Sequence, residues 1–159
     1  MLHNRARNQK GFTLVELLIV VIILGILAAV VIPQFNTAAS ESKEAALASN
    51  LATIRQAIEM YKVQHNDVFP TAAIETELTT KTNISGGTTG TLLYGPYLRN
   101  SFPKNPVDSA NSTLIGTSTT AGALPAGDGG SQWFYNTADG AFFANTSGSG
   151  PSGTAYTSL

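Results

Sequence analysis

The sequence predicts an α+β fold in which a long N-terminal α-helix packs on a small antiparallel β-sheet domain. Three observations predict it. An apolar run of 21 residues occupies Phe12–Ile32. Apolar side chains then recur every three or four residues from Leu47 to Tyr61, which is the period of an amphipathic helix. Near the C-terminus, two aromatic-rich runs flank Asp139-Gly140, a pair that favours a hairpin turn.

The composition narrows the class of protein before any motif is considered. Only 12% of the 159 residues are charged, about half the usual share for a soluble domain. The net charge of −1 provides no basic face for nucleic acid. The absence of cysteine excludes disulfides and thiolate metal sites, and the two histidines, His3 and His65, lie far apart in the sequence. These values favour a membrane-associated or exported small protein and argue against most enzymes.

The N-terminal segment combines a basic start with an apolar run of membrane-spanning length. Residues 1–11 carry three positive charges, Arg5, Arg7 and Lys10, and no negative ones. As a helix, Phe12–Ile32 would span roughly 32 Å, enough to cross a bilayer core of about 30 Å. The basic flank predicts that the N-terminus lies in the cytoplasm.

Glu16 distinguishes the interpretations of this apolar run. A cleaved secretory signal peptide and an uncleaved membrane anchor both fit the basic start, although a signal peptide's apolar stretch is usually shorter. Neither interpretation explains a carboxylate inside a membrane span, which costs about 2.5–3.5 kcal/mol on insertion scales. Glu16 is therefore expected to have a specific role.

The string GFTLVELLIV at residues 11–20 resembles the leader junction of type IV pilins and type II secretion pseudopilins. The resemblance implies that residues 1–11 are a leader, which a membrane peptidase removes by cutting between Gly11 and Phe12 and then N-methylating Phe12. It also implies that Glu16 of an incoming subunit is neutralised by the Phe12 amine of its neighbour. An alternative left open is that Glu16 pairs with that amine within one helix, since positions i and i+4 share a face.

The resemblance also implies partners and a place in the cell. The partners are other copies of the chain in a homopolymer, the prepilin peptidase/methyltransferase, an inner-membrane assembly platform with its ATPase, minor pseudopilins and inner-membrane lipid. Nucleic acid is not expected. The chain would span the inner membrane once, with its C-terminal domain in the periplasm.

The helix is expected to continue beyond the apolar run and to end near residues 65–67. Its second half, residues 34–66, carries an apolar stripe that is expected to pack under the C-terminal domain, while a free coiled coil is a weaker interpretation. Pro33 lacks an amide hydrogen and Gly25 loosens the helix, so a kink or local melting is expected between them. His65 is interpreted as a partner of the helix C-terminus rather than a metal ligand.

Short elements are predicted for the C-terminal domain, residues 67–146. They comprise a helix at Ala72–Leu78, core contacts from Leu92–Leu98, a short strand at Thr113–Gly116, and a hairpin of Gln132–Asn136 with Ala141–Asn145. The hairpin aromatics are expected to cover the helix stripe, with an aromatic ligand cage as the alternative. The tail, residues 147–159, is expected to be flexible or loosely docked.

The order of these elements and the string PKNPVD resemble the major pseudopilin of type II secretion. In that subfamily the connection after the helix often carries a Pro-Lys-Asp-Pro string, and a calcium ion is held by acidic residues of a later loop. Here Asn105 stands where the resemblance implies an aspartate, and the loop offers only Asp108 and Asp128 as weak candidate ligands. No cofactor is therefore expected, with calcium kept as an alternative.

No arrangement of residues indicates catalysis, because there is no cysteine nucleophile and the Gly86–Gly90 loop lacks the lysine of a phosphate-binding loop. Together with this, the resemblance implies a non-enzymatic, pilin-like subunit of a type II secretion pseudopilus that drives protein export across the outer membrane. Two alternatives stay open: a type IV pilus subunit for adhesion, motility or DNA uptake, and a monomeric membrane-anchored binding domain.

Overall fold

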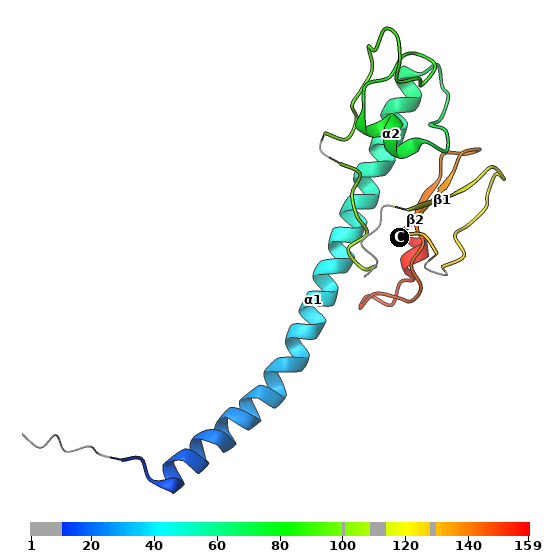
Figure 1. Ribbon diagram of the computed structural model, residues 1–159. Helices are drawn as coiled ribbons and strands as arrows, with labels where there is room; N and C mark the ends of the chain where they lie inside the picture. The colour runs from blue at the N-terminus through cyan, green and yellow to red at the C-terminus, as the bar shows by residue number, and fades with distance from the viewer. Residues whose placement is uncertain (1–10, 100, 109–113, 128–129) are drawn as a thin grey trace, which may run out of the picture. The chain divides into compact units, whose positions relative to one another are not determined.

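The computed structural model describes residues 11–99, 101–108, 114–127 and 130–159. Its elements, in chain order, are α1 (Leu14–Gln64), α2 (Ile74–Thr79), β1 (Ile115–Ser118), β2 (Trp133–Asn136), β3 (Phe142–Ala144) and the 3-10 helix η1 (Tyr156–Ser158) (Figure 1). The long helix and the small three-stranded sheet confirm the predicted α+β class. The chain forms two units, one ending at Ala38 and one running from Ala39 to Leu159, and α1 contributes to both.

The second half of α1 carries the predicted apolar stripe, and all five of its members are buried. These side chains are 0–2% exposed, and they are Leu47, Leu51, Ile54, Ile58 and Tyr61. Their spacing places them on one face of the helix. The interpretation that this stripe packs under the C-terminal domain is confirmed.

The end of α1 is set by local chemistry, as predicted. Asn66 adopts a positive φ of 55°, a conformation that asparagine tolerates well, and the amide of Asp67 donates to the carbonyl of Lys62 over 3.0 Å. His65 is 2% exposed, and its Nδ1 lies 2.8 Å from the carbonyl oxygen of Tyr61 in the last turn. His65 is thus a partner of a helix-end carbonyl, in agreement with the prediction.

The sheet has the order β1-β2-β3 and mixed strand directions. The pair β2–β3 is antiparallel with Trp133 opposite Ala144, so the predicted hairpin is confirmed. The pair β1–β2 is parallel with Ile115 opposite Trp133, so the expectation of a purely antiparallel sheet is wrong for β1. The connection between these strands is long enough to return along the sheet, as a parallel pair requires. The strand also lies later than predicted, at Ile115–Ser118.

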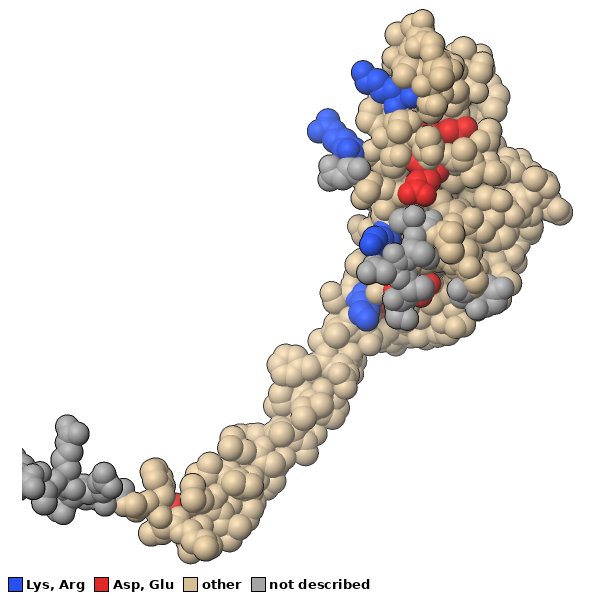
Figure 2. Space-filling view, in the orientation of Figure 1, with Lys and Arg blue, Asp and Glu red and all other residues tan. Residues whose placement is uncertain are grey.

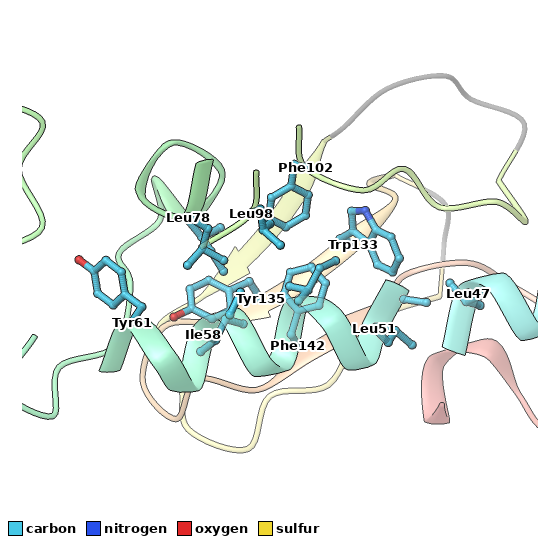
Figure 3. Packing of buried hydrophobic residues seen from close by; sticks show 14 residues of the cluster. Leu47, Leu51, Ile58, Tyr61, Leu78, Leu98, Phe102, Trp133, Tyr135 and Phe142 are labelled. Atoms are coloured by element: carbon cyan, nitrogen blue, oxygen red, sulfur yellow. The ribbon is translucent and has the colours of Figure 1, made fainter. Parts of the chain in front are cut away.

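The sheet aromatics close the core over the α1 stripe. Figure 3 shows Trp133, Tyr135 and Phe142 lying over the part of α1 that carries Leu51 and Ile58. The polar atoms of the two larger rings are satisfied: the Trp133 indole donates to the carbonyl of Pro103 (3.0 Å) and the Tyr135 hydroxyl to that of Pro70 (2.8 Å). Burial raises the pKa of Tyr135. These rings pack in the core, as predicted, and do not form a ligand cage.

The segment Leu92–Leu98 contributes less to the core than predicted. Leu98 is buried, but Leu93 is 73% exposed. The backbone explains the difference, because Leu93 and Tyr94 pair with Thr82 in a short bridge that turns Leu93 outward. Phe102 is 2% exposed and fills part of the core instead.

The tail was expected to be flexible or loosely docked, and in the structure it is docked on the second unit. The guanidinium of Arg55 donates to the carbonyl oxygen of Phe142 (2.8 and 3.0 Å) and to the main-chain oxygen of Leu159 (2.6 Å). Glu44 accepts hydrogen bonds from the amide and hydroxyl of Ser152. One arginine on α1 therefore holds both β3 and the end of the tail.

Truncation of the stripe should destabilise the second unit strongly. Ile58→Ala removes a side chain that is 1% exposed, and we expect it to lower the free energy of unfolding by about 2–5 kcal/mol because a cavity is left. Urea unfolding of the full chain in detergent, followed by the fluorescence of Trp133, measures this. The control Val63→Ala changes a side chain that is 76% exposed and should alter stability by less than about 0.5 kcal/mol. Equal effects from the two variants would contradict the assigned core.

Candidate processing and assembly site

The predicted cleavage bond lies in an exposed, non-helical segment just before α1. Gly11, Phe12 and Thr13 precede the first helical residue, Leu14, and the Phe12 side chain is 79% exposed. An extended, exposed segment presents its peptide bonds to a protease more readily than a helix does. The rest of the predicted leader, with Arg5, Arg7 and Lys10, lies outside the described residues.

Thr13 and Glu16 form a reciprocal cap at the start of α1. The amide and the hydroxyl of Thr13 each donate to Oε2 of Glu16 over 2.8 Å. The amide of Glu16 in turn donates to the hydroxyl of Thr13 over 3.3 Å. This is a capping box, in which the side chains of the first residue and of the residue three positions later satisfy each other's amides.

The cap gives Glu16 a partner within its own chain. The two pairings expected from the sequence both used an amine at Phe12, and the intact chain has none because Phe12 follows Gly11 in a peptide bond. Thr13 instead satisfies one carboxylate oxygen, and the negative charge also lies at the positive end of the helix dipole. Sequence reasoning missed this contact, although a threonine followed three residues later by a glutamate ahead of an apolar run signals it.

The helix after Glu16 has a wholly exposed apolar surface. Each large apolar side chain from Leu14 to Ile32 is at least 41% exposed, and Val31 is the most covered of them. Between Phe12 and Ser40 the sequence has no charged residue except Glu16, and in Figure 2 the charged side chains of the visible face lie on the second unit apart from one red patch at the start of the helix. Helix α1 is long and apolar enough to cross a membrane, with a mean hydropathy of 3.2 in its most apolar window. Such a surface requires lipid or protein around it.

Pro33 does not interrupt α1 in the single chain. The helix is continuous from Leu14 to Gln64, with no melted stretch between Gly25 and Pro33 in the single chain, and the kink that was the other expectation stays a prediction. Pro33 cannot donate to the carbonyl of Ala29, which weakens the ladder at this turn. The hydroxyl of Thr37 donates to the carbonyl oxygen of Pro33 over 3.2 Å. Melting of this stretch within a filament stays a prediction.

The structure describes one of the two weak calcium candidates. Asp108 is half-buried near the end of a described segment, and Asp128 lies outside the described residues. Within the part of the chain that the structure describes, no three His, Cys, Asp or Glu side chains are close enough to hold a metal ion.

Comparisons with known proteins agree with this geometry. Residues 6–32 match the prokaryotic N-terminal methylation motif. The chain is 42% identical over 59 residues to the type II secretion system core protein G of Pseudomonas aeruginosa, covering 37% of this chain and 42% of that protein. It is 36% identical over 82 residues to the protein of the same name from Vibrio cholerae, covering 50% of this chain and 56% of the relative.

A relative from another filament system is also similar. The type IV major fimbrial protein FimA of Dichelobacter nodosus is 51% identical over 51 residues, covering 32% of this chain and 33% of that protein. These matches span about half the length of the relatives, or less. No solved structure matches the chain. The predicted resemblance to pilins and pseudopilins is confirmed, and the apolar helix fits a membrane-anchored subunit.

Removal of the Thr13 hydroxyl should loosen the start of α1. Thr13→Val keeps the shape of the side chain but removes the acceptor for the Glu16 amide, a loss worth about 1 kcal/mol for a typical cap. We expect the amide hydrogen of Glu16 to exchange about five to ten times faster, measured by NMR in detergent micelles. Thr37→Val is the matched control, because the Thr37 hydroxyl donates to the carbonyl oxygen of Pro33, farther along the helix. Unchanged exchange at Glu16 in Thr13→Val would exclude the cap.

Proposed function

We propose that this chain is the structural subunit of a type II secretion pseudopilus, which polymerises through its N-terminal helix to drive protein export across the outer membrane. The observation that carries the proposal is the exposed apolar half of α1, which begins with a capped carboxylate inside the methylation motif. The chain itself performs no catalysis; cleavage, methylation and ATP hydrolysis belong to its partners.

Lipid covers the apolar half of α1 before assembly, and neighbouring helices replace the lipid in the filament. Cleavage after Gly11 creates an ammonium group at Phe12, next to the capping residue Thr13. In an apolar environment this ammonium and the Glu16 carboxylate each need a partner of opposite charge. Pairing of Glu16 with the ammonium of a neighbouring subunit would satisfy both groups and fix the axial position of the new subunit.

The partners and the location follow from the same proposal. Arg5, Arg7 and Lys10 hold the N-terminus in the cytoplasm, where the prepilin peptidase/methyltransferase acts on Gly11 and Phe12. An inner-membrane assembly platform with its ATPase then adds the subunit to a periplasmic filament that also contains minor pseudopilins. The second unit lies on the periplasmic side.

A type IV pilus subunit is the alternative function. The similarity to the fimbrial protein favours it, but that match covers 51 residues, whereas the match to the Vibrio cholerae secretion protein covers 82. A filament that extends beyond the cell surface would indicate a pilus, and a short periplasmic filament a pseudopilus. A monomeric membrane-anchored binding domain is the third candidate, and it requires neither cleavage at Gly11 nor Glu16.

The intact mass of the protein from its native membranes tests the processing step. We expect a mass equal to that of Phe12–Leu159 plus one methyl group, about 14 Da, with the methyl on the N-terminal residue in fragmentation spectra. A mass covering Met1–Leu159 would refute processing and leave a membrane anchor.

Loss of the Glu16 carboxylate tests assembly. In cells that form the filament, Glu16→Leu should reduce the amount of this subunit recovered in assembled filaments from lysed cells by about tenfold or more, because the ammonium of the neighbouring subunit is left without a partner in an apolar environment. The subunit should still reach the membrane at normal levels, as judged by membrane fractionation. Glu59→Leu removes an exposed carboxylate of the second unit and is the control. Equal filament yields from the two variants would refute the assembly role of Glu16, and absence of the unmodified chain from every filament would favour the monomeric binding domain.

A further inference from the structure

The structure describes the connection between β1 and β2 at residues 119–127 and 130–132. It runs from Thr119 to Gln132 and is rich in Gly, Ser, Thr and Ala, with Leu124 as its largest apolar side chain at 71% exposure. A loop of this kind has almost no apolar surface to bury, so hydrogen bonds must hold it against the loss of chain entropy.

The first part of the loop is attached to the turn of the hairpin. Asn136, at the end of β2 and 0% exposed, donates from Nδ2 to the carbonyl of Thr120 over 2.7 Å. The amide of Gly122 donates to Oδ2 of Asp139 over 2.7 Å, and Asn136 Nδ2 also lies 3.2 Å from this oxygen. The amides of Gly122 and Ala141 lower the pKa of Asp139, so its carboxylate is charged at neutral pH.

The second part of the loop is attached to the end of β3. Oδ1 of Asn145, which is 5% exposed, accepts from the amide of Gly127 over 2.7 Å. Its Nδ2 donates to the hydroxyl of Ser131 over 2.9 Å, and that hydroxyl donates to the carbonyl of Trp133. The loop is thus held at Thr120, Gly122 and Gly127 by side chains of the hairpin.

Asn105 extends this arrangement beneath the loop. It is 3% exposed and donates from Nδ2 to the carbonyl of Gln132 (3.1 Å) and to the hydroxyl of Thr146 (2.8 Å). An aspartate at this position could not donate and would place a carboxylate against the carbonyl of Gln132. The surroundings of position 105 therefore favour the asparagine found here over the aspartate that the resemblance implies.

These contacts are of the wrong kind for a calcium site. Calcium takes six to eight oxygen ligands, and loop carbonyls commonly supply several of them. Here amide N–H groups point at carbonyl oxygens of the loop and of its junction with β2, those of Thr120 and Gln132. We infer that Asn136, Asp139 and Asn145 hold the β1–β2 loop in place of a bound cation, and that the second unit folds fully without calcium.

Thermal unfolding of the full chain in detergent, followed by Trp133 fluorescence, tests the inference. The Tm in excess EDTA should lie within about 1 °C of the Tm in 5 mM CaCl2, a concentration that would saturate sites of about 0.1–1 mM affinity. Asn136→Ala should lower the Tm by about 5 °C under both conditions. Thr119→Ala, which alters an exposed side chain of the same loop, is the control and should leave the Tm unchanged.

Two results would overturn the inference. One is a Tm at least about 5 °C higher with calcium than with EDTA, abolished by Asp128→Ala. The other is an unchanged Tm in Asn136→Ala.

If Asn136→Ala does not fold, two measurements on the unmodified chain decide instead. Calorimetric titration with calcium should show no site tighter than about 1 mM, and the amides of Gly122 and Gly127 should be protected from exchange in EDTA. A tighter site, or loss of that protection in EDTA, would refute the inference.

Discussion

Burial of the α1 stripe against the sheet aromatics is the interaction on which the second unit depends. Strands of three or four residues are too short to form an independently stable sheet. Packing of Trp133 and Phe142 on the face of α1 that carries Leu51 and Ile58 supplies the missing apolar contact. Other contacts add hydrogen bonds to this packed arrangement. Arg55, for example, binds β3 and the tail.

The same helix meets two different surroundings along its length. Beyond residue 43 one face of α1 is covered by its own chain, whereas before Ser40 every described side chain is exposed and nearly all are uncharged. A single helix can thus belong to a folded domain at one end and remain available to lipid or to other helices at the other. The Thr13–Glu16 cap satisfies the polar start of the exposed half.

Local patterns in the sequence predicted the features that depend on nearby residues. The period of Leu47, Ile54 and Tyr61 marked the buried face, and Asp139-Gly140 marked the hairpin. The direction of β1 and the docking of Leu159 escaped prediction, because they depend on partners far along the chain: Arg55 bonds residues 87 and 104 positions away. The loop contacts of Asn136 and Asn145 were equally unpredictable, since an amide side chain does not reveal its partner. The Thr13–Glu16 cap could have been predicted from the spacing of these two residues, but it was not.

The α1 stripe and the sheet aromatics that cover it lie far apart in the sequence, and this distance affects how the chain folds during synthesis. Leu51 and Ile58 leave the ribosome long before Trp133 and Phe142, which lie in the last fifth of the chain. At typical synthesis rates this interval is several seconds, and about ten seconds or more for the slower ribosomes. Helix α1 can form at once, but its apolar face has no cover during that time. The newborn subunit therefore passes through a stage at which its folded-state core is an open, aggregation-prone surface.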